Sequence, residues 1–231
     1  MTSFIDYKSP EKDILINILN EYPLMDSTNI SSIIENMIYE EVEEYYENGT
    51  LKCKYILRFG EKHGLYKGWN ENGEKWEECG YLYGEKDGLY ERWFENGQKF
   101  EEWSYRNGKL EGLYKQWFEN GLKSLEFTYQ DDKRNGLVKS WFNNGQKYLE
   151  CNYRDGKRNG LYQTWFENGQ KHEEFHCLDG KLEGLYKSWH DNGQKREEFH
   201  YRYGKKEGLY HEWNDHGQLI KECTYRDGKE V

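Results

Sequence analysis

Carboxylates recur at a fixed spacing along most of this chain, and pairs of carboxylates can perform general acid–base chemistry. All of them except the last, Glu222, follow a lysine by three positions. A catalytic pair needs environments that push the two pKa values apart, but every copy here has similar neighbours. The pattern therefore predicts a ladder of ion pairs or hydrogen bonds. The glutamates are Glu78, Glu102, Glu126, Glu150, Glu174, Glu198 and Glu222, and the lysines are Lys75, Lys99, Lys123, Lys147, Lys171 and Lys195.

Histidine and cysteine are the other residues that could carry chemistry. His176 and His200 lie 24 residues apart, which would place them about 10 Å apart on neighbouring hairpins. Zinc ligands instead converge to about 2.0–2.2 Å from one ion. The five cysteines show no CxxC spacing, and most share apolar positions of the pattern. We therefore expect no metal, no cofactor and buried, unreactive thiols.

Motifs that mark nucleotide sites or hydrolases are missing from the chain. It contains no GxxxxGK[ST], GxGxxG, GxSxG or HExxH. Its glycines occur at turn positions instead. The sequence therefore predicts a protein that is not an enzyme.

The spacing of these residues reflects a 24-residue unit that repeats eight times, without insertion or deletion, from Glu40 to Val231. Such periodicity is the signature of a repeat architecture, in which function lies on a repeated surface. A Gly-Leu step opens most units, and a tryptophan follows five residues after the glycine. The tryptophans are Trp69, Trp93, Trp117, Trp141, Trp165, Trp189 and Trp213.

Each unit is predicted to be one β-hairpin, as the unit Gly88–Glu111 illustrates. Leu89–Phe94 is short and rich in aromatic residues, and the Glu95-Asn96-Gly97 turn contains residues that tolerate positive φ. Frequent glycines and short distances between turns exclude helices. The predicted fold is all-β: an elongated, single-layer antiparallel array of eight hairpins, with sixteen strands spanning roughly 75 Å.

The register of these hairpins has two readings. A three-residue turn that ends in a left-handed glycine would put Leu89 and Trp93 on one face with Trp103 and Tyr105. Tyr90 would then lie on the opposite face. A two-residue turn would exchange the faces, because side chains alternate along a strand. We favour the first reading, because it collects more apolar residues on one face.

Two regions are predicted. Residues 1–39 carry a helix start signal at Ser9-Pro10 and apolar residues at helical spacing, such as Ile14 and Ile18. We expect a short α-helical N-terminal cap over the first strand, with a docking module for a partner helix as the alternative. Residues 40–231 form the β-hairpin repeats.

Charge restricts the partners. The net charge is −10, which argues against nucleic acid and against anionic lipid, since both attract Lys and Arg. The chain contains no run of about 18 apolar residues, so no transmembrane helix is predicted. No signal peptide is visible at the N-terminus, so we expect an intracellular, reducing location.

A tyrosine follows the Gly-Leu step in most units. Tyrosine and tryptophan supply much of the binding energy at protein interfaces, so this column of equivalent positions is the candidate binding surface. The alternative is that the rings only stack on one another along the sheet. The candidates are Tyr66, Tyr90, Tyr114, Tyr162, Tyr186 and Tyr210.

The unit G-L-Y-K-x-W-F-E-N-G-Q-K-x-E-E-x-x-Y-x-x-G-K, as in Gly112–Lys133 and Gly184–Lys205, resembles the variant form of the MORN repeat. The resemblance covers about five-sixths of the chain. It is similar to multi-copy proteins of bacteria and of large DNA viruses of amoebae, which would imply host cytoplasm or virion as the location. Asp132 in place of glycine, Val138 in place of tyrosine and the altered first unit depart from the pattern.

The resemblance implies a non-enzymatic scaffold or protein–protein interaction module that uses a repeated aromatic β-surface. A membrane- or lipid-associating module and an antitoxin-like binding protein are the alternatives it suggests. The terminal strands would also present open edges, through which self-association could occur by strand addition. Lys221 and Glu222 would blunt the C-terminal edge.

Overall fold

The computed structural model describes residues 39–231. The predicted N-terminal helices and their capping role lie outside the described residues. The first strand starts at Tyr39, one residue before the predicted start of the repeats.

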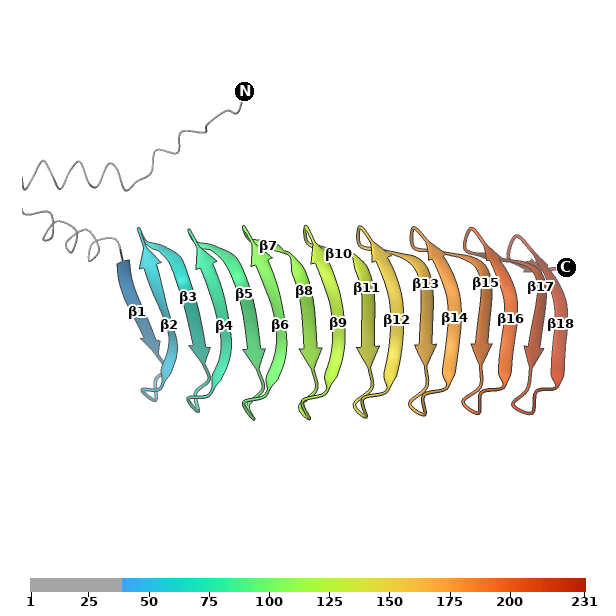
Figure 1. The fold of residues 1–231 in the computed structure, drawn as a ribbon, viewed down its shortest axis with the longest axis horizontal. Coiled ribbons are helices and arrows are strands. Elements are labelled where there is room, and N and C mark those ends of the chain that lie inside the picture. The colour runs from blue at the N-terminus through green and yellow to red at the C-terminus, as the bar shows by residue number, and fades with distance from the viewer. Residues whose placement is uncertain (1–38) are drawn as a thin grey trace, which may run out of the picture.

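The described residues form one open antiparallel sheet of nineteen strands (Figure 1). Each long strand pairs with the strands before and after it in the chain, so the sheet grows hairpin by hairpin. The strands are β1 (Tyr39–Tyr45), β2 (Leu51–Arg58), β3 (Glu61–Trp69), β4 (Lys75–Leu82), β5 (Glu85–Trp93), β6 (Lys99–Arg106), β7 (Lys109–Leu110), β8 (Gly112–Trp117), β9 (Lys123–Gln130), β10 (Lys133–Arg134), β11 (Gly136–Trp141), β12 (Lys147–Arg154), β13 (Lys157–Trp165), β14 (Lys171–Leu178), β15 (Lys181–Trp189), β16 (Lys195–Arg202), β17 (Lys205–Trp213), β18 (Leu219–Arg226) and β19 (Lys229–Glu230).

The predicted all-β array of hairpins is confirmed, with a small difference in how its strands divide. Glu111 separates β7 from β8, and Asn135 separates β10 from β11. The backbone N–H of each separating residue still donates to the neighbouring strand, Glu111 to Ser104 at 3.0 Å and Asn135 to Thr128 at 2.9 Å. The breaks are therefore local irregularities within continuous strands.

Two kinds of turn alternate along the chain. In the Glu95-Asn96-Gly97 turn, the Gly97 N–H donates to the carbonyl of Phe94 at 2.9 Å, and Gly97 has a φ of 78°. At the other end of the hairpins, Asn107 and Gly108 have φ values of 50° and 74°. Positive φ at both central residues is the geometry that matches the twist of a two-residue hairpin. The three-residue turns line the lower edge of the sheet in Figure 1, and the two-residue turns line the upper edge.

The favoured register is wrong, although the three-residue turn on which it rested is correct. Tyr90 pairs with Trp103, and Leu89 pairs with Ser104. A β-bulge explains the difference: Trp93 pairs with Lys99 but Arg92 pairs with Glu101, which leaves Phe100 as an extra residue. One extra residue shifts the register by one and moves each side chain of the first strand to the other face.

The sheet consequently has two different faces. On the face that we call the tyrosine face, Tyr90 is 7% exposed and lies with Trp103 and Tyr105. On the opposite face, the leucine face, Leu89 is 49% exposed and lies with the lysine and glutamate ladder. A buried cluster on the tyrosine face contains Phe127, Val138 and Cys151.

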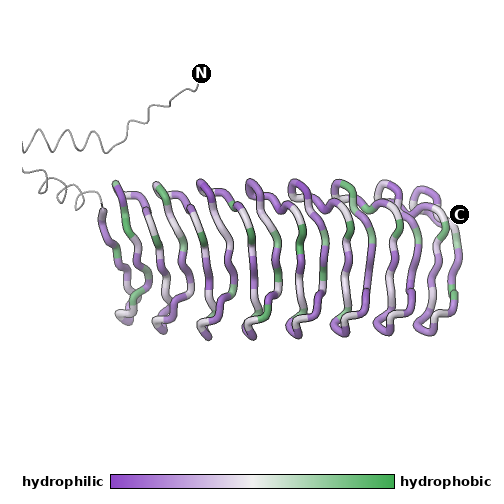
Figure 2. The backbone as a smooth tube through the Cα atoms, viewed as in Figure 1, coloured by the Kyte–Doolittle hydropathy of each residue, from purple (hydrophilic) through white to green (hydrophobic). Residues whose placement is uncertain are grey.

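The array is one layer thick. Figure 2 shows short apolar stretches that recur from hairpin to hairpin between polar ones. Within residues 39–231 no second layer covers either face, and no helix is long and apolar enough to cross a membrane. Each hairpin contacts mainly its neighbours, so stability should be approximately additive along the array.

Candidate binding surface

The predicted tyrosine column lies on the tyrosine face, where its rings stack on aromatic residues of the following strand. The ring centroids of Tyr90 and Trp103 lie 4.2 Å apart, and those of Tyr114 and Phe127 lie 4.7 Å apart. Offset stacking at such distances contributes about 0.5–1.5 kcal/mol per pair beyond the area that is buried. The tyrosines thus hold neighbouring strands together.

Carboxylates of the preceding hairpin bind several of the tyrosine hydroxyls. The Tyr90 hydroxyl donates to Glu77 at 2.6 Å, and the Tyr114 hydroxyl donates to Glu101 at 2.7 Å. Burial, and then the adjacent carboxylate, raises the pKa of these two phenols. Both phenols are therefore neutral hydrogen-bond donors over the physiological range.

Exposure differs among the six tyrosine candidates. Tyr90 and Tyr210 are buried, whereas Tyr66, Tyr114, Tyr162 and Tyr186 are half-buried. The structure gives all six a place in the ring ladder or beside it. Their role in binding a partner stays a prediction.

The ladder of ion pairs is confirmed on the leucine face. Lys99 Nζ lies 2.7 Å from a Glu102 carboxylate oxygen, and Lys195 lies at the same distance from Glu198. The hydrogen bond from Lys195 lowers the pKa of Glu198. Each lysine also lies near the tryptophan of the next hairpin, with Lys75 Nζ 3.8 Å from the Trp93 ring centre. This regular contact orders the lysine column.

The histidine and cysteine side chains of the described residues do not gather into one site. In the described part of the chain, no three His, Cys, Asp or Glu residues lie close enough together to hold a metal ion. His176 and His200 are exposed. All five cysteines are free, and four of them are buried. Burial raises the pKa of the Cys79 and Cys151 thiols to about 11, which keeps them protonated.

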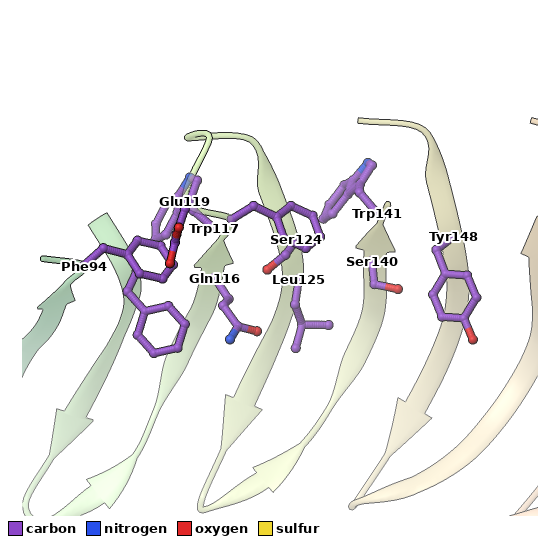
Figure 3. A pocket seen from close by; sticks show the side chains of 11 residues that line it. Phe94, Gln116, Trp117, Glu119, Ser124, Leu125, Ser140, Trp141 and Tyr148 are labelled. Carbon is purple, nitrogen blue, oxygen red and sulfur yellow. The ribbon is translucent and has the colours of Figure 1, made fainter. Parts of the chain in front are cut away.

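A second aromatic row, which the sequence reasoning missed, lies at the three-residue turns. Phe94 contacts Phe100 with centroids 4.8 Å apart, and Phe142 contacts Tyr148 at 5.0 Å. Between these pairs lies a hollow of about 520 Å³. Its walls include Phe94, Phe100, Phe118, Leu125, Trp141 and Tyr148, and we call it the notch. Figure 3 shows Ser124 in the notch between Phe94 and Tyr148.

Exposed carboxylates accompany this aromatic row. Asparagine side chains connect consecutive turns: Asn120 Nδ2 donates to the Asn143 carbonyl at 2.9 Å, and Asn168 Nδ2 donates to the Asp191 carbonyl at 2.6 Å. These hydrogen bonds link the backbones of consecutive turns, while the acidic side chains face solvent. The exposed acidic residues are Glu71, Glu95, Glu119, Glu167, Asp191 and Asp215.

The repeats themselves match a known family. Five stretches of the chain match the MORN repeat variant. They are residues 41–56, 86–107, 134–155, 158–176 and 182–203. MORN repeats are generally interaction modules for proteins or membranes. The unit around the notch, residues 112–133, lies outside the matched stretches, as do residues 57–85 and 204–231.

Comparisons with whole proteins add little to the MORN repeat match. No curated protein matches the chain. Among solved structures, the chain is similar to "Crystal Structure of TarM", with 10% identity and a TM-score of 0.26. That match covers 74% of this chain but only 26% of the TarM chain. A TarM variant from S. aureus in complex with fondaparinux, alpha-GlcNAc-glycerol and UDP gives the same TM-score of 0.26 and 10% identity, with 75% and 27% covered.

Proposed function

We propose that this chain is a non-enzymatic scaffold that binds protein partners through the aromatic tyrosine face of its sheet. The observation that carries the proposal is that this face holds the apolar core, yet no second layer covers it within residues 39–231. Aromatic residues dominate the energetics of protein interfaces. The half-buried rings of this face offer such contacts in several hairpins. They are Tyr66, Tyr114, Tyr162 and Tyr186.

Exposed apolar residues near the three-residue turns support this proposal. Tyr148 is 44% exposed and Leu122 is 43% exposed, next to the half-buried rings of Phe118 and Phe142. Free thiols at all five cysteines support an intracellular, reducing location, where disulfides are rare. A viral origin and self-association through the terminal edges stay predictions.

Charge weighs against the membrane alternative. The chain has a net charge of −10, and anionic membrane surfaces attract basic segments instead. Flotation of the full chain with phosphatidylserine-containing vesicles measures this alternative directly. We expect the protein to remain at the bottom of the gradient.

The test of the proposal is affinity capture from native lysate with the full chain and two matched double variants. Phe94→Ala with Phe142→Ala removes rings at the tyrosine-face end of the turns. Leu89→Ala with Leu137→Ala removes exposed side chains from the leucine face. We expect retained proteins, quantified by mass spectrometry, to be lost with the phenylalanine variant and kept with the leucine variant.

Circular dichroism must first show that both variants keep the β spectrum of the parent. Retention that depends only on the leucine face would contradict the proposed surface. Failure of the parent to retain any protein would contradict the proposed function.

A further inference from the structure

The notch lies beside three departures from the repeat at the start of one strand, β9. In the other units the residue after the turn glycine is mostly glutamine, but here it is Leu122. Two positions on, Ser124 occupies a column that holds a ring in four units, as Trp76, Phe100, Tyr148 and His172, and holds Lys52, Arg196 or Ile220 in the other three. The next residue, Leu125, occupies a column that holds glutamate in half of the units. All three changes lie at one end of a single hairpin and make that end more apolar or less filled.

Ser124 interrupts a row of ring pairs that spans the third to the sixth unit. Phe94 pairs with Phe100, Phe142 with Tyr148, and Phe166 with His172, at centroid distances of 4.8, 5.0 and 4.4 Å. Phe118 occupies the equivalent position in the fourth unit, where its counterpart is Ser124. A serine supplies no ring, so the stacking site beside Phe118 is open.

The open site is an open surface hollow with a mainly aromatic lining, and a hollow of the same volume lies in the next unit beside Phe142, Tyr148 and Phe166. The notch measures about 520 Å³, within the range of about 300–1,000 Å³ typical of ligand pockets. Its walls are mainly aromatic and aliphatic, and Trp117 and Trp141 contribute to them. The Ser124 hydroxyl at its base is buried without a hydrogen-bond partner. An incoming aromatic group would find ring surfaces on both sides and one polar atom beneath.

Negative charge beside the notch favours basic residues next to that aromatic group. Glu119 lines the notch, and Glu95 lies on the turn of the preceding hairpin. Both side chains are exposed, and neither forms an ion pair within residues 39–231. An approaching segment with lysine or arginine would gain electrostatic complementarity, which favours encounter and specificity.

We propose that the notch receives an aromatic side chain of a partner polypeptide, which flanks it with lysine or arginine residues that face Glu95 and Glu119. The inference rests on the proposed scaffold function and names its central contact. The ring of the partner takes the place that Ser124 leaves open. The repeated aromatic face on either side then provides secondary contacts.

The test is a selection of random 12-residue peptides displayed on phage against the immobilised full chain. We expect enriched peptides to carry Phe, Tyr or Trp with a lysine or arginine within three positions. Selected peptides, synthesised with a fluorophore, are then titrated by fluorescence anisotropy against the parent and its variants.

Ser124→Phe fills the notch with a side chain of the protein itself, and we expect it to weaken binding at least tenfold. Arg196→Phe is the matched control, because it adds a ring at the same column three hairpins away. We expect binding to that control within twofold of the parent. Glu119→Gln should weaken binding by several-fold and reduce its salt dependence, whereas Asp215→Asn on a distant turn should not.

The outcomes separate the two proposals. Enriched peptides that bind Ser124→Phe as tightly as the parent would overturn the notch but leave the scaffold function standing. No enrichment of any peptide over an unrelated control protein would overturn both. A parent that sediments as an oligomer and a Ser124→Phe variant that sediments as a monomer would assign the notch to a second copy and overturn the partner proposed here.

Discussion

Two hairpins of the array, β8–β9 and β15–β16, have the same ring packing but different surroundings. The centroids of Tyr114 and Phe127 lie 4.7 Å apart, and those of Tyr186 and Phe199 also lie 4.7 Å apart. In β15–β16, Glu197 accepts a hydrogen bond from the next tyrosine, Tyr210, at 2.7 Å.

In β8–β9 the corresponding pair is apolar. Leu125 takes the glutamate position, and Val138 takes the tyrosine position 13 residues later. The carboxylate and the phenol have thus been replaced together, which avoids a buried polar group without a partner. The two hairpins thus share the ring ladder that stabilises the sheet. The residues in the columns beside the ladder differ, and such a difference accompanies the notch.

The largest effect is expected when the equivalent core ring is removed from each hairpin, which tests whether the two ring ladders are equivalent. Phe127 is 2% exposed and Phe199 is 3% exposed, so Phe127→Ala and Phe199→Ala should both be severe. We expect each to lower the free energy of unfolding by about 3 kcal/mol, the low end for buried phenylalanine. Urea denaturation followed by far-ultraviolet circular dichroism measures both. A much milder loss in one hairpin would show that the two ring ladders are not equivalent.

Filling the notch with a ring and removing a ring beside it should change the free energy of unfolding in opposite directions. Ser124→Phe adds a ring beside Phe118, and we expect it to raise the free energy of unfolding by about 1 kcal/mol. Phe100→Ser removes the ring that Phe94 contacts, and we expect a loss of about 1–2 kcal/mol. The same urea titrations give both values. Destabilisation by Ser124→Phe would mean that the notch is too small for a ring.

The tyrosine–glutamate pairs predict sensitivity to base. The pKa of Tyr114 is raised in the folded state by burial and by Glu101. Its contribution to stability is therefore fully present below the unfolded pKa of about 10 and is lost as the pH rises above it. Tyr114→Phe should cost about 1 kcal/mol at pH 8, and the difference from the parent should shrink by pH 11. Equal differences at the two pH values would contradict a buried, neutral phenol at this position.

The smallest effect is expected at the turn that follows β9. Asp132 has a φ of 62°, where most other units have glycine, such as Gly204. Asp132→Gly relieves a left-handed conformation, at a gain of about 1 kcal/mol. It also removes the hydrogen bond that Asp132 accepts from the Leu110 N–H at 2.7 Å, worth about as much. We expect thermal melting within about 2 °C of the parent, and a large shift either way would show that one of the two terms dominates.

Much of the fold could be predicted because its signals are local. Asn96 and Gly97 specify a turn with positive φ, and Lys99 three positions before Glu102 specifies an ion pair. The register could not be predicted in the same way. The bulge at Phe100 leaves no mark in the residue types, because an aromatic residue suits either face of a strand. One unmarked extra residue was enough to exchange the faces of Leu89 and Tyr90.

The notch left a signal that the repeat itself obscured. Leu122, Ser124 and Leu125 are visible departures in the sequence, but each is an ordinary residue for a strand. Only the structure shows that Ser124 and Leu125 line one hollow with Phe118, where a neighbouring ring is missing. A departure from the repeat thus becomes informative once the structure shows on which face its column lies and which side chains are its neighbours.

The most direct test of this account compares two adjacent residues on opposite faces of β8. Tyr114 stacks in the ring ladder, whereas Leu113 is 43% exposed on the leucine face. We expect Tyr114→Ala to lower the free energy of unfolding by about 3 kcal/mol and Leu113→Ala by less than about 1 kcal/mol. The reverse order, with Leu113→Ala the more damaging, would contradict the assignment of the tyrosine face as the core and restore the register that the sequence favoured.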